Sequence, residues 1–125
     1  MATLLYVDDE VPIGRIIDRF FTRRGDKVLL ARSIAEAQQL LDQCAPTAVF
    51  IDVWLGDESG FELFSWIEDN RPDLAGRVSF VTGDFVDDHA SARPYEHLGC
   101  PFIQKPFELT ALARWVDGAE ERVVT

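Results

Sequence analysis

The stretch Ala48-Val49-Phe50-Ile51-Asp52 decides the fold, because four apolar residues run directly into a single carboxylate. An apolar run without polar alternation is typical of a strand that is covered on both faces, as in a parallel sheet. Similar runs recur at Thr3–Val7, Lys27–Ala31, Val78–Val81 and Phe102–Gln104. We therefore expect one strand in the quoted stretch and one in each of these four ranges.

Helical patterns lie between these runs. The first has apolar residues at the i, i+3, i+4, i+7 spacing of one buried helix face, namely Ile13, Ile16, Ile17, Phe20 and Phe21. Helices are expected from Pro12 to Gly25, from the capping box of Ser33 and Glu36 onward, over Gly60–Asn70, and from Leu109 past Val116. An irregular helix is expected at 87–98, where Pro94 interrupts the pattern. Alternating strands and helices predict a doubly wound α/β fold.

Length and composition fit one compact domain. The chain has 125 residues, of which 47% are apolar, enough for a hydrophobic core. No apolar stretch approaches the ~20 residues of a membrane span, and the N-terminus lacks the pattern of a signal peptide. We therefore expect a cytoplasmic protein with no membrane contact. The net charge of -10 argues against direct binding of nucleic acids and suits a site for a cation.

Polar residues directly follow four of the five predicted strands. They are Asp8 and Asp9 after the first strand, Asp52 after the third, Thr82 and Gly83 after the fourth, and Lys105 and Pro106 after the fifth. In a doubly wound fold the carboxyl ends of parallel strands meet at one edge of the sheet, where ligands bind. The pattern therefore predicts a single site at this edge.

The residue types indicate the chemistry of this site. Two carboxylates ~4 Å apart repel by about 4 kcal/mol at an effective dielectric constant of ~20, so Asp8, Asp9 and Asp52 need protons or a cation. Oxygen ligands without His or Cys favour Mg2+, which readily binds phosphoryl oxygens. Lys105 would balance the remaining charge, and the Thr82 hydroxyl could donate to a phosphoryl oxygen. Asp52 is the best candidate for a covalent nucleophile.

Taken together, these motifs resemble the receiver domain of two-component response regulators. The resemblance covers 1–125 as a single receiver domain. It rests on Asp8-Asp9, on Asp52 with Gly60 eight residues later, on Thr82-Gly83 and on Lys105-Pro106-Phe107. It implies a flavodoxin-like, five-stranded parallel sheet of strand order 2-1-3-4-5, flanked by about five helices.

The resemblance also implies a role for each matching residue. Asp52 would accept a phosphoryl group from a histidine kinase or a histidine phosphotransfer protein. Mg2+ would be held by Asp8, Asp9, Asp52 and the backbone carbonyl of Trp54. Lys105 would contact the acyl phosphate, and Thr82 would bind the phosphoryl group. Gly60, Gly83 and Pro106 would be structural, with a cis Lys105–Pro106 bond.

Phosphorylation would change the conformation of Thr82 and Phe102, according to the same resemblance. The surface from strand four through helix four to strand five would then be reshaped for a downstream protein, or for a homodimer through helix four, strand five and helix five. Such a domain is not a conventional enzyme, since it would catalyse its own Mg2+-dependent phosphorylation and slow dephosphorylation. Trp54 and Gly56 depart from the family pattern, and Trp54 is bulky enough to slow attack by water.

Other classes of protein fit the sequence less well. A phosphatase of the haloacid dehalogenase type needs a second Asp two residues after the nucleophile, where this chain has Trp54. Neither GxxxxGK[ST] nor GxGxxG occurs, which argues against a nucleotide-binding module. The alternative that stays open is a receiver-like interaction scaffold that is never phosphorylated.

Overall fold

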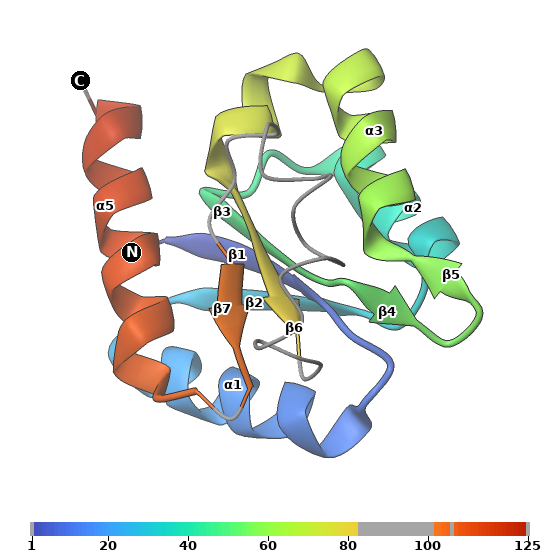
Figure 1. Ribbon diagram of the computed structural model, residues 1–125. Coiled ribbons are helices and arrows are strands. Elements are labelled where there is room, and N and C mark those ends of the chain that lie inside the picture. Colours follow the sequence, from blue (N-terminus) through green and yellow to red (C-terminus); the bar gives the residue numbers. More distant parts are fainter. Residues whose placement is uncertain (1, 83–101, 106, 125) are drawn as a thin grey trace.

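The computed structural model describes residues 2–82, 102–105 and 107–124. Within them, five parallel strands form one sheet in the order β2-β1-β3-β6-β7 (Figure 1). These strands are β1 (Thr3–Val7), β2 (Lys27–Ala31), β3 (Ala48–Asp52), β6 (Val78–Thr82) and β7 (Phe102–Gln104). Counted along the chain within this sheet, the order is 2-1-3-4-5, so the predicted sheet is confirmed.

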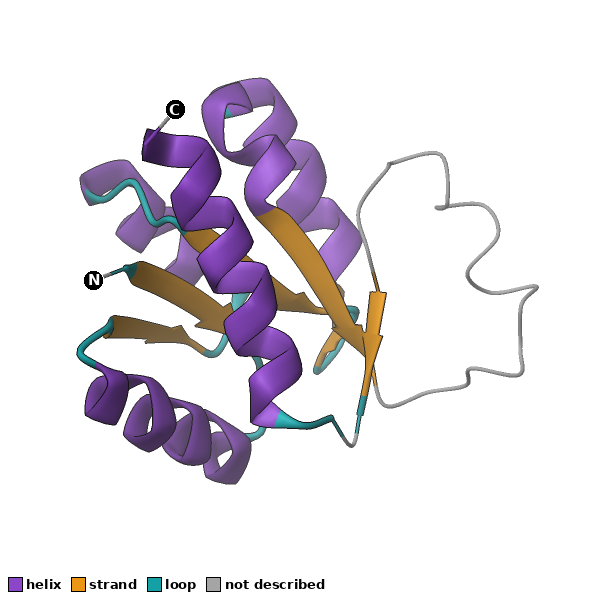
Figure 2. Cartoon of the chain, turned by 90° about the vertical axis from the view of Figure 1, so that its left-hand side faces the viewer, coloured by secondary structure: helices purple, strands orange, loops and turns teal. Residues whose placement is uncertain are grey.

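Helices cover both faces of the sheet (Figures 1 and 2). They are α1 (Val11–Arg24), α2 (Ile34–Gln43), α3 (Gly60–Asn70) and α5 (Leu109–Val124). On one face, α1 and α5 pack against a core that includes Tyr6 and Phe50. On the other, α2 and α3 pack against Ile51 and Phe80. Every residue of β3 and β6 is buried, as expected for central strands of a doubly covered sheet. The helix predicted at 87–98 lies outside the described residues.

The ends of the helices follow the local sequence. Pro12 lies in the first turn of α1, and Gly25 closes this helix with a φ of 95°, a left-handed conformation that favours glycine. The Ser33 hydroxyl accepts a hydrogen bond from the Glu36 N–H at 3.2 Å and caps α2. Ser59 caps α3 in the same way. The helix starts expected at Pro12 and Ser33 and the stop expected at Gly25 are therefore confirmed.

Two short elements were not expected from the sequence. A hairpin of β4 (Trp54–Leu55) and β5 (Glu58–Ser59) follows β3, and a 3-10 helix, η1 (Pro72–Arg77), precedes β6. Gly56 lies in the turn of this hairpin with a φ of 62°. Two-residue strands are too short to show a hydrophobic period, so the pattern could not indicate them. The hairpin matters for the site because it begins just after Asp52.

Gly60 allows a close approach between the start of α3 and the end of β3. A Cβ atom at this position would lie 2.1 Å from the Asp52 carbonyl oxygen and 2.8 Å from Ile51 Cγ2. The Gly60 N–H donates to the Val53 carbonyl at 2.7 Å, which fixes the backbone at this point. Any side chain at Gly60 would therefore displace the strand end that carries Asp52.

We expect Gly60→Ala to lower the free energy of unfolding by roughly 3 kcal/mol, because backbone atoms must move to accept the methyl group. The matched control is Gly118→Ala in α5, where a Cβ atom would meet nothing within 4 Å. This control should gain up to ~1 kcal/mol from helix propensity. Urea denaturation of both variants measures the difference, and equal stability of the two would contradict the close approach.

Candidate functional site

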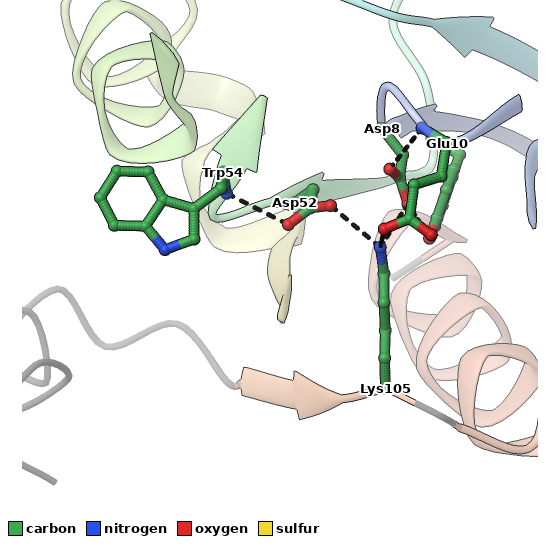
Figure 3. Close-up of polar contacts among 6 residues, drawn as sticks. Asp8, Glu10, Asp52, Trp54 and Lys105 are labelled. Atoms are coloured by element: carbon green, nitrogen blue, oxygen red, sulfur yellow. Dashed lines mark hydrogen bonds and ion pairs between the residues drawn. The ribbon is translucent and has the colours of Figure 1, made fainter. Parts of the chain in front are cut away.

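The carboxyl edge of the sheet brings together residues that are far apart in the sequence. Asp8 follows β1, Asp52 ends β3, and Lys105 follows β7. These strands lie in one parallel series, in which β1 pairs with β3, β3 with β6 and β6 with β7. Figure 3 shows the three side chains converging at this edge. The predicted meeting of polar strand ends at one place is therefore seen for Asp8, Asp52 and Lys105.

Lys105 lies at the centre of this group. Its Nζ atom is 2.8 Å from Asp8 Oδ2 and 2.9 Å from Asp52 Oδ2. A third acid, Glu10, places Oε1 at 3.2 Å from the same nitrogen. Asp8 and Asp52 are only 4% and 5% exposed, so these ion pairs are shielded from water. One ammonium group thus holds together carboxylates from two different parts of the chain.

The second oxygen of Asp52 is held by the hairpin that follows β3. Asp52 Oδ1 accepts a hydrogen bond from the Trp54 N–H at 3.1 Å. The Trp54 side chain is 54% exposed, and Figure 3 shows its ring directed away from the acids. The hairpin therefore orients the carboxylate through its backbone while the indole borders the site from outside.

Glu10 takes the place in this group that the sequence had suggested for Asp9. Ligand oxygens of Asp8, Glu10 and Asp52 lie within 4.8 Å of one another, the one such cluster of three among the described residues. Asp9 is exposed and lies beside the hairpin turn, with Oδ2 3.9 Å from the Cβ position of Gly56. Glu10 is also exposed, at 56% of its side chain, but it reaches Lys105, and the run Asp8-Asp9-Glu10 does not show which of its acids does so. A role for Asp9 in holding a metal stays a prediction.

The surroundings of Asp52 and Lys105 shift their pKa values in different ways. Burial raises the pKa of Asp52 from 3.8 to about 6; the Lys105 hydrogen bond acts against this shift, and the Asp8 charge adds to it. Burial on its own would lower the pKa of Lys105, but hydrogen bonds to Asp8 and Asp52 outweigh it and raise that pKa. Lys105 therefore stays an ammonium at neutral pH, and Asp52 is mostly ionised but destabilised by its burial.

The charges of the group fit a bound cation. Three carboxylates carry -3 and Lys105 carries +1, which leaves -2 in a site where Asp8 and Asp52 are buried and Glu10 is exposed. Charged oxygen ligands without nitrogen or sulfur are the set that hard divalent cations such as Mg2+ prefer. Asp8, Glu10 and Asp52 are therefore compatible with a metal ion.

Phe102 lies on β7, the strand that Lys105 follows, and Thr82 ends the neighbouring strand β6. Thr82 is 8% exposed at the end of β6, and its carbonyl accepts a hydrogen bond from the Lys105 N–H at 2.7 Å. Phe102 is partly buried in β7, with its ring centroid 5.3 Å from that of Phe80 and 6.2 Å from that of Phe61. The predicted structural residues Gly83 and Pro106, and the cis bond before Pro106, lie outside the described residues.

A doubly wound parallel sheet binds ligands at its carboxyl edge, where this chain gathers buried carboxylates and one lysine. The family model for the response regulator receiver domain matches residues 4–117, so the chain belongs to this family. The resemblance noted in the sequence is thereby confirmed, and the chain is a receiver domain of the two-component response regulators.

Individual relatives agree with this assignment. The chain is 28% identical to the DNA-binding transcriptional regulator NtrC of Rhizobium meliloti, over 89% of this chain and 22% of that protein. A response regulator from Burkholderia pseudomallei, solved with a phosphorylated aspartic acid, a calcium ion and citrate, is 25% identical with a TM-score of 0.80, over 99% of this chain and 72% of that chain. The beryllofluoride-activated NtrC4 receiver domain dimer is 27% identical with a TM-score of 0.82, over 98% of both chains.

The chain matches only part of the length of its curated relatives. It spans 22% to 43% of the first curated relatives that it matches. Within the described residues, no helix combines the length and the apolar character needed to cross a membrane.

We expect Asp52→Asn to raise the free energy of unfolding at pH 7 by on the order of 2 kcal/mol when divalent cations are removed with EDTA. The folded chain keeps the Asp52 proton to a higher pH than the unfolded chain, since the pKa rises from 3.8 to about 6. Asp52 therefore lowers the stability of the wild type as pH rises from about 4 to about 6. Urea denaturation across this range should show that the difference between the two proteins grows with pH.

The control is Asp73→Asn, at an exposed carboxylate whose pKa is lowered by its hydrogen bond with Arg71. Neutralising Asp73 should not raise stability at any pH. A wild type that is as stable as Asp52→Asn from pH 4 to pH 7 would mean that the burial of Asp52 carries no cost.

Proposed function

We propose that the chain accepts a phosphoryl group on Asp52 from a phosphohistidine, with Mg2+ bound at the acidic cluster. The observation that carries this proposal is the place of Asp52 in the group. Its Oδ2 lies 2.9 Å from Lys105 Nζ, inside a cluster of three carboxylates that carries more negative charge than Lys105 balances. A nucleophile, a positive charge and a place for a cation are the parts that phosphoryl transfer needs.

In the proposed reaction, a carboxylate oxygen of Asp52 attacks the phosphorus atom of the phosphohistidine. A P–O bond forms and the P–N bond breaks, and the imidazole nitrogen keeps the electron pair and takes up a proton from water. Lys105 pairs with one phosphoryl oxygen, and the Thr82 hydroxyl donates to another. These residues act mainly by positioning and by neutralising charge, as is general for phosphoryl transfer.

The metal would be held by Asp8, Glu10 and Asp52, with Asp9 and the Trp54 carbonyl as further candidate ligands. A bound Mg2+ would supply charge neutralisation at the phosphoryl oxygens. Among the described residues, Asp8 Oδ2 already accepts two hydrogen bonds or ion pairs, whereas each oxygen of Asp52 accepts one, so Asp52 is the better nucleophile. Burial also raises the pKa of Asp52, which makes its oxygens more basic.

Phosphorylation would then act on the strands that carry Thr82 and Phe102. Lys105 and Thr82 are joined by a backbone hydrogen bond, so a shift of either backbone toward the phosphoryl group would be shared by β6 and β7. Phe102 packs against Phe80 and Phe61, and its side chain would move with them. The altered surface would be read by a downstream protein or by a second copy of the chain. We place this single receiver domain in the cytoplasm and assign it no nucleic-acid contact of its own.

The phosphodonor, a histidine kinase or a histidine phosphotransfer protein, would approach over α1. A groove between α1 and the start of α5 leads to Lys105 and is lined by Ile13, Ile16, Ile17, Lys105, Phe107 and Leu109. Ile16, which lines this groove, is 55% exposed and so offers apolar surface to a partner. An adjoining hollow gathers Arg15, Arg19, Arg23 and Arg24 on a chain of net charge -10. These features favour a donor with an apolar strip and an acidic border.

Incubation with acetyl phosphate and Mg2+ should add one phosphoryl group to the wild type and none to Asp52→Asn, as measured by intact mass. Asp57→Asn, an exposed acid in the neighbouring hairpin turn, is the control and should be phosphorylated like the wild type. The alternative function, an interaction scaffold that is never phosphorylated, predicts an unchanged mass for a folded wild type that binds Mg2+. A phosphoryl group on Asp52→Asn would show that another residue is the acceptor.

We expect Ile16→Glu to slow transfer from a phosphohistidine donor protein by about tenfold, because it places a charge on the apolar strip. Phosphorylation by acetyl phosphate should stay unchanged, since this small donor does not need the groove. Ala35→Glu, at an exposed position on α2 across the sheet, is the control. An equal loss with both donors would mean that Ile16 acts through the fold, and no loss with the protein donor would remove α1 from the docking surface.

A further inference from the structure

We infer that Tyr6 is a positioning residue of the metal site, whose hydroxyl holds the Asp8 carboxylate in the orientation that binds the cation. This inference rests on the proposed function, because it concerns the same acidic cluster. The sequence did not indicate it, since Tyr6 lies within the apolar run Thr3–Val7 and looks like an ordinary core residue.

Tyr6 reaches the acidic cluster from the hydrophobic core. Tyr6 precedes Asp8 by two residues. Side chains two residues apart along a strand point to the same face of the sheet, so both side chains lie on one face. The Tyr6 hydroxyl donates a hydrogen bond to Asp8 Oδ2 at 2.9 Å. The ring is 1% exposed and packs in the core beneath α1 and α5, with its centroid 6.3 Å from that of Phe50. The apolar core therefore fixes the position of the Tyr6 hydroxyl, and the hydroxyl in turn orients the Asp8 carboxylate.

The contacts of Asp8 show what this hydrogen bond does. Oδ1 accepts the Glu10 N–H at 2.9 Å, and Oδ2 accepts both the Tyr6 hydroxyl and Lys105 Nζ. A carboxylate oxygen has two lone pairs, so among the contacts of the described residues Oδ2 uses both of its lone pairs and Oδ1 uses one. Lys105 is shared with Asp52 and Glu10, whereas Tyr6 serves Asp8 alone in these contacts.

The two partners of Asp8 Oδ2 therefore have different roles. Lys105 has a long, flexible side chain, and in the proposed reaction it turns to a phosphoryl oxygen. Tyr6 cannot follow, because its ring is packed within the core. It remains the fixed donor that holds Asp8 when the ammonium leaves. Burial, and then the Asp8 charge, raise the pKa of Tyr6 above its usual range, so the hydroxyl keeps its proton and acts as a donor. Hydrogen-bond partners that orient metal ligands are a general feature of metal sites.

The test is Tyr6→Phe, which removes the hydroxyl and keeps the ring. We expect Mg2+ to bind about tenfold more weakly in isothermal titration calorimetry, while urea denaturation in EDTA shows that the variant is still folded. The control is Thr22→Val, which removes a hydroxyl that donates to Asp18 at 3.0 Å on the exposed side of α1. It should bind Mg2+ like the wild type.

A double-mutant cycle with Asp8→Asn separates positioning from general destabilisation. If Tyr6 acts through Asp8, Tyr6→Phe should change the Mg2+ affinity little once Asp8 is neutral. Equal affinity of wild type and Tyr6→Phe, tighter binding by the variant, or the same loss in the Asp8→Asn background would each overturn the inference and leave the proposed function standing. A folded wild type that binds no Mg2+ would instead remove the metal site and with it both proposals.

Discussion

The ion pairs between the Lys105 ammonium and three carboxylates at the carboxyl edge of the sheet are the interactions on which the arrangement of the site depends. Removing charged groups from water is costly unless they are paired, and here the pairing is incomplete, because the acids outnumber the ammonium. The fold tolerates this imbalance at its edge because its two cores are otherwise apolar and closely packed. The result is a site that gains stability when a cation or a change of charge arrives.

The same arrangement connects the charged site to the outer strands. Lys105 is tied to Thr82 by a backbone hydrogen bond, and β6 pairs with β7 through the register of Phe80 with Phe102. A displacement that reaches the Lys105 backbone would therefore involve both strands, which have aromatic side chains packed between them and α3. Such coupling needs no new fold. It needs only two conformations of the same residues with similar free energies. A phosphoryl group can then make the less stable conformation the more stable one.

The sequence predicted the sheet and the main site residues for a clear physical reason. Apolar runs such as Ala48–Ile51 identify buried strands, and in a parallel sheet the residue after each run must lie at the common edge. Local turns were harder to predict. Glu10 enters the cluster because Asp8 Oδ1 accepts its N–H, a contact between neighbours that no periodicity reveals. The role of the Tyr6 hydroxyl could not be predicted from the sequence either. Its ring fits an apolar run, and its hydrogen bond to Asp8 is visible only in the three-dimensional structure.

A crystal structure determined with Mg2+ and beryllofluoride would test most directly the claim that Asp52 accepts a phosphoryl group beside a bound cation and Lys105. The account predicts a cation bound by Asp8 and Asp52, a beryllofluoride adduct on the Asp52 carboxylate, and Lys105 turned from Asp8 toward that adduct. A cation bound elsewhere, with Lys105 still joining Asp8 to Asp52 and no adduct on Asp52, would contradict it.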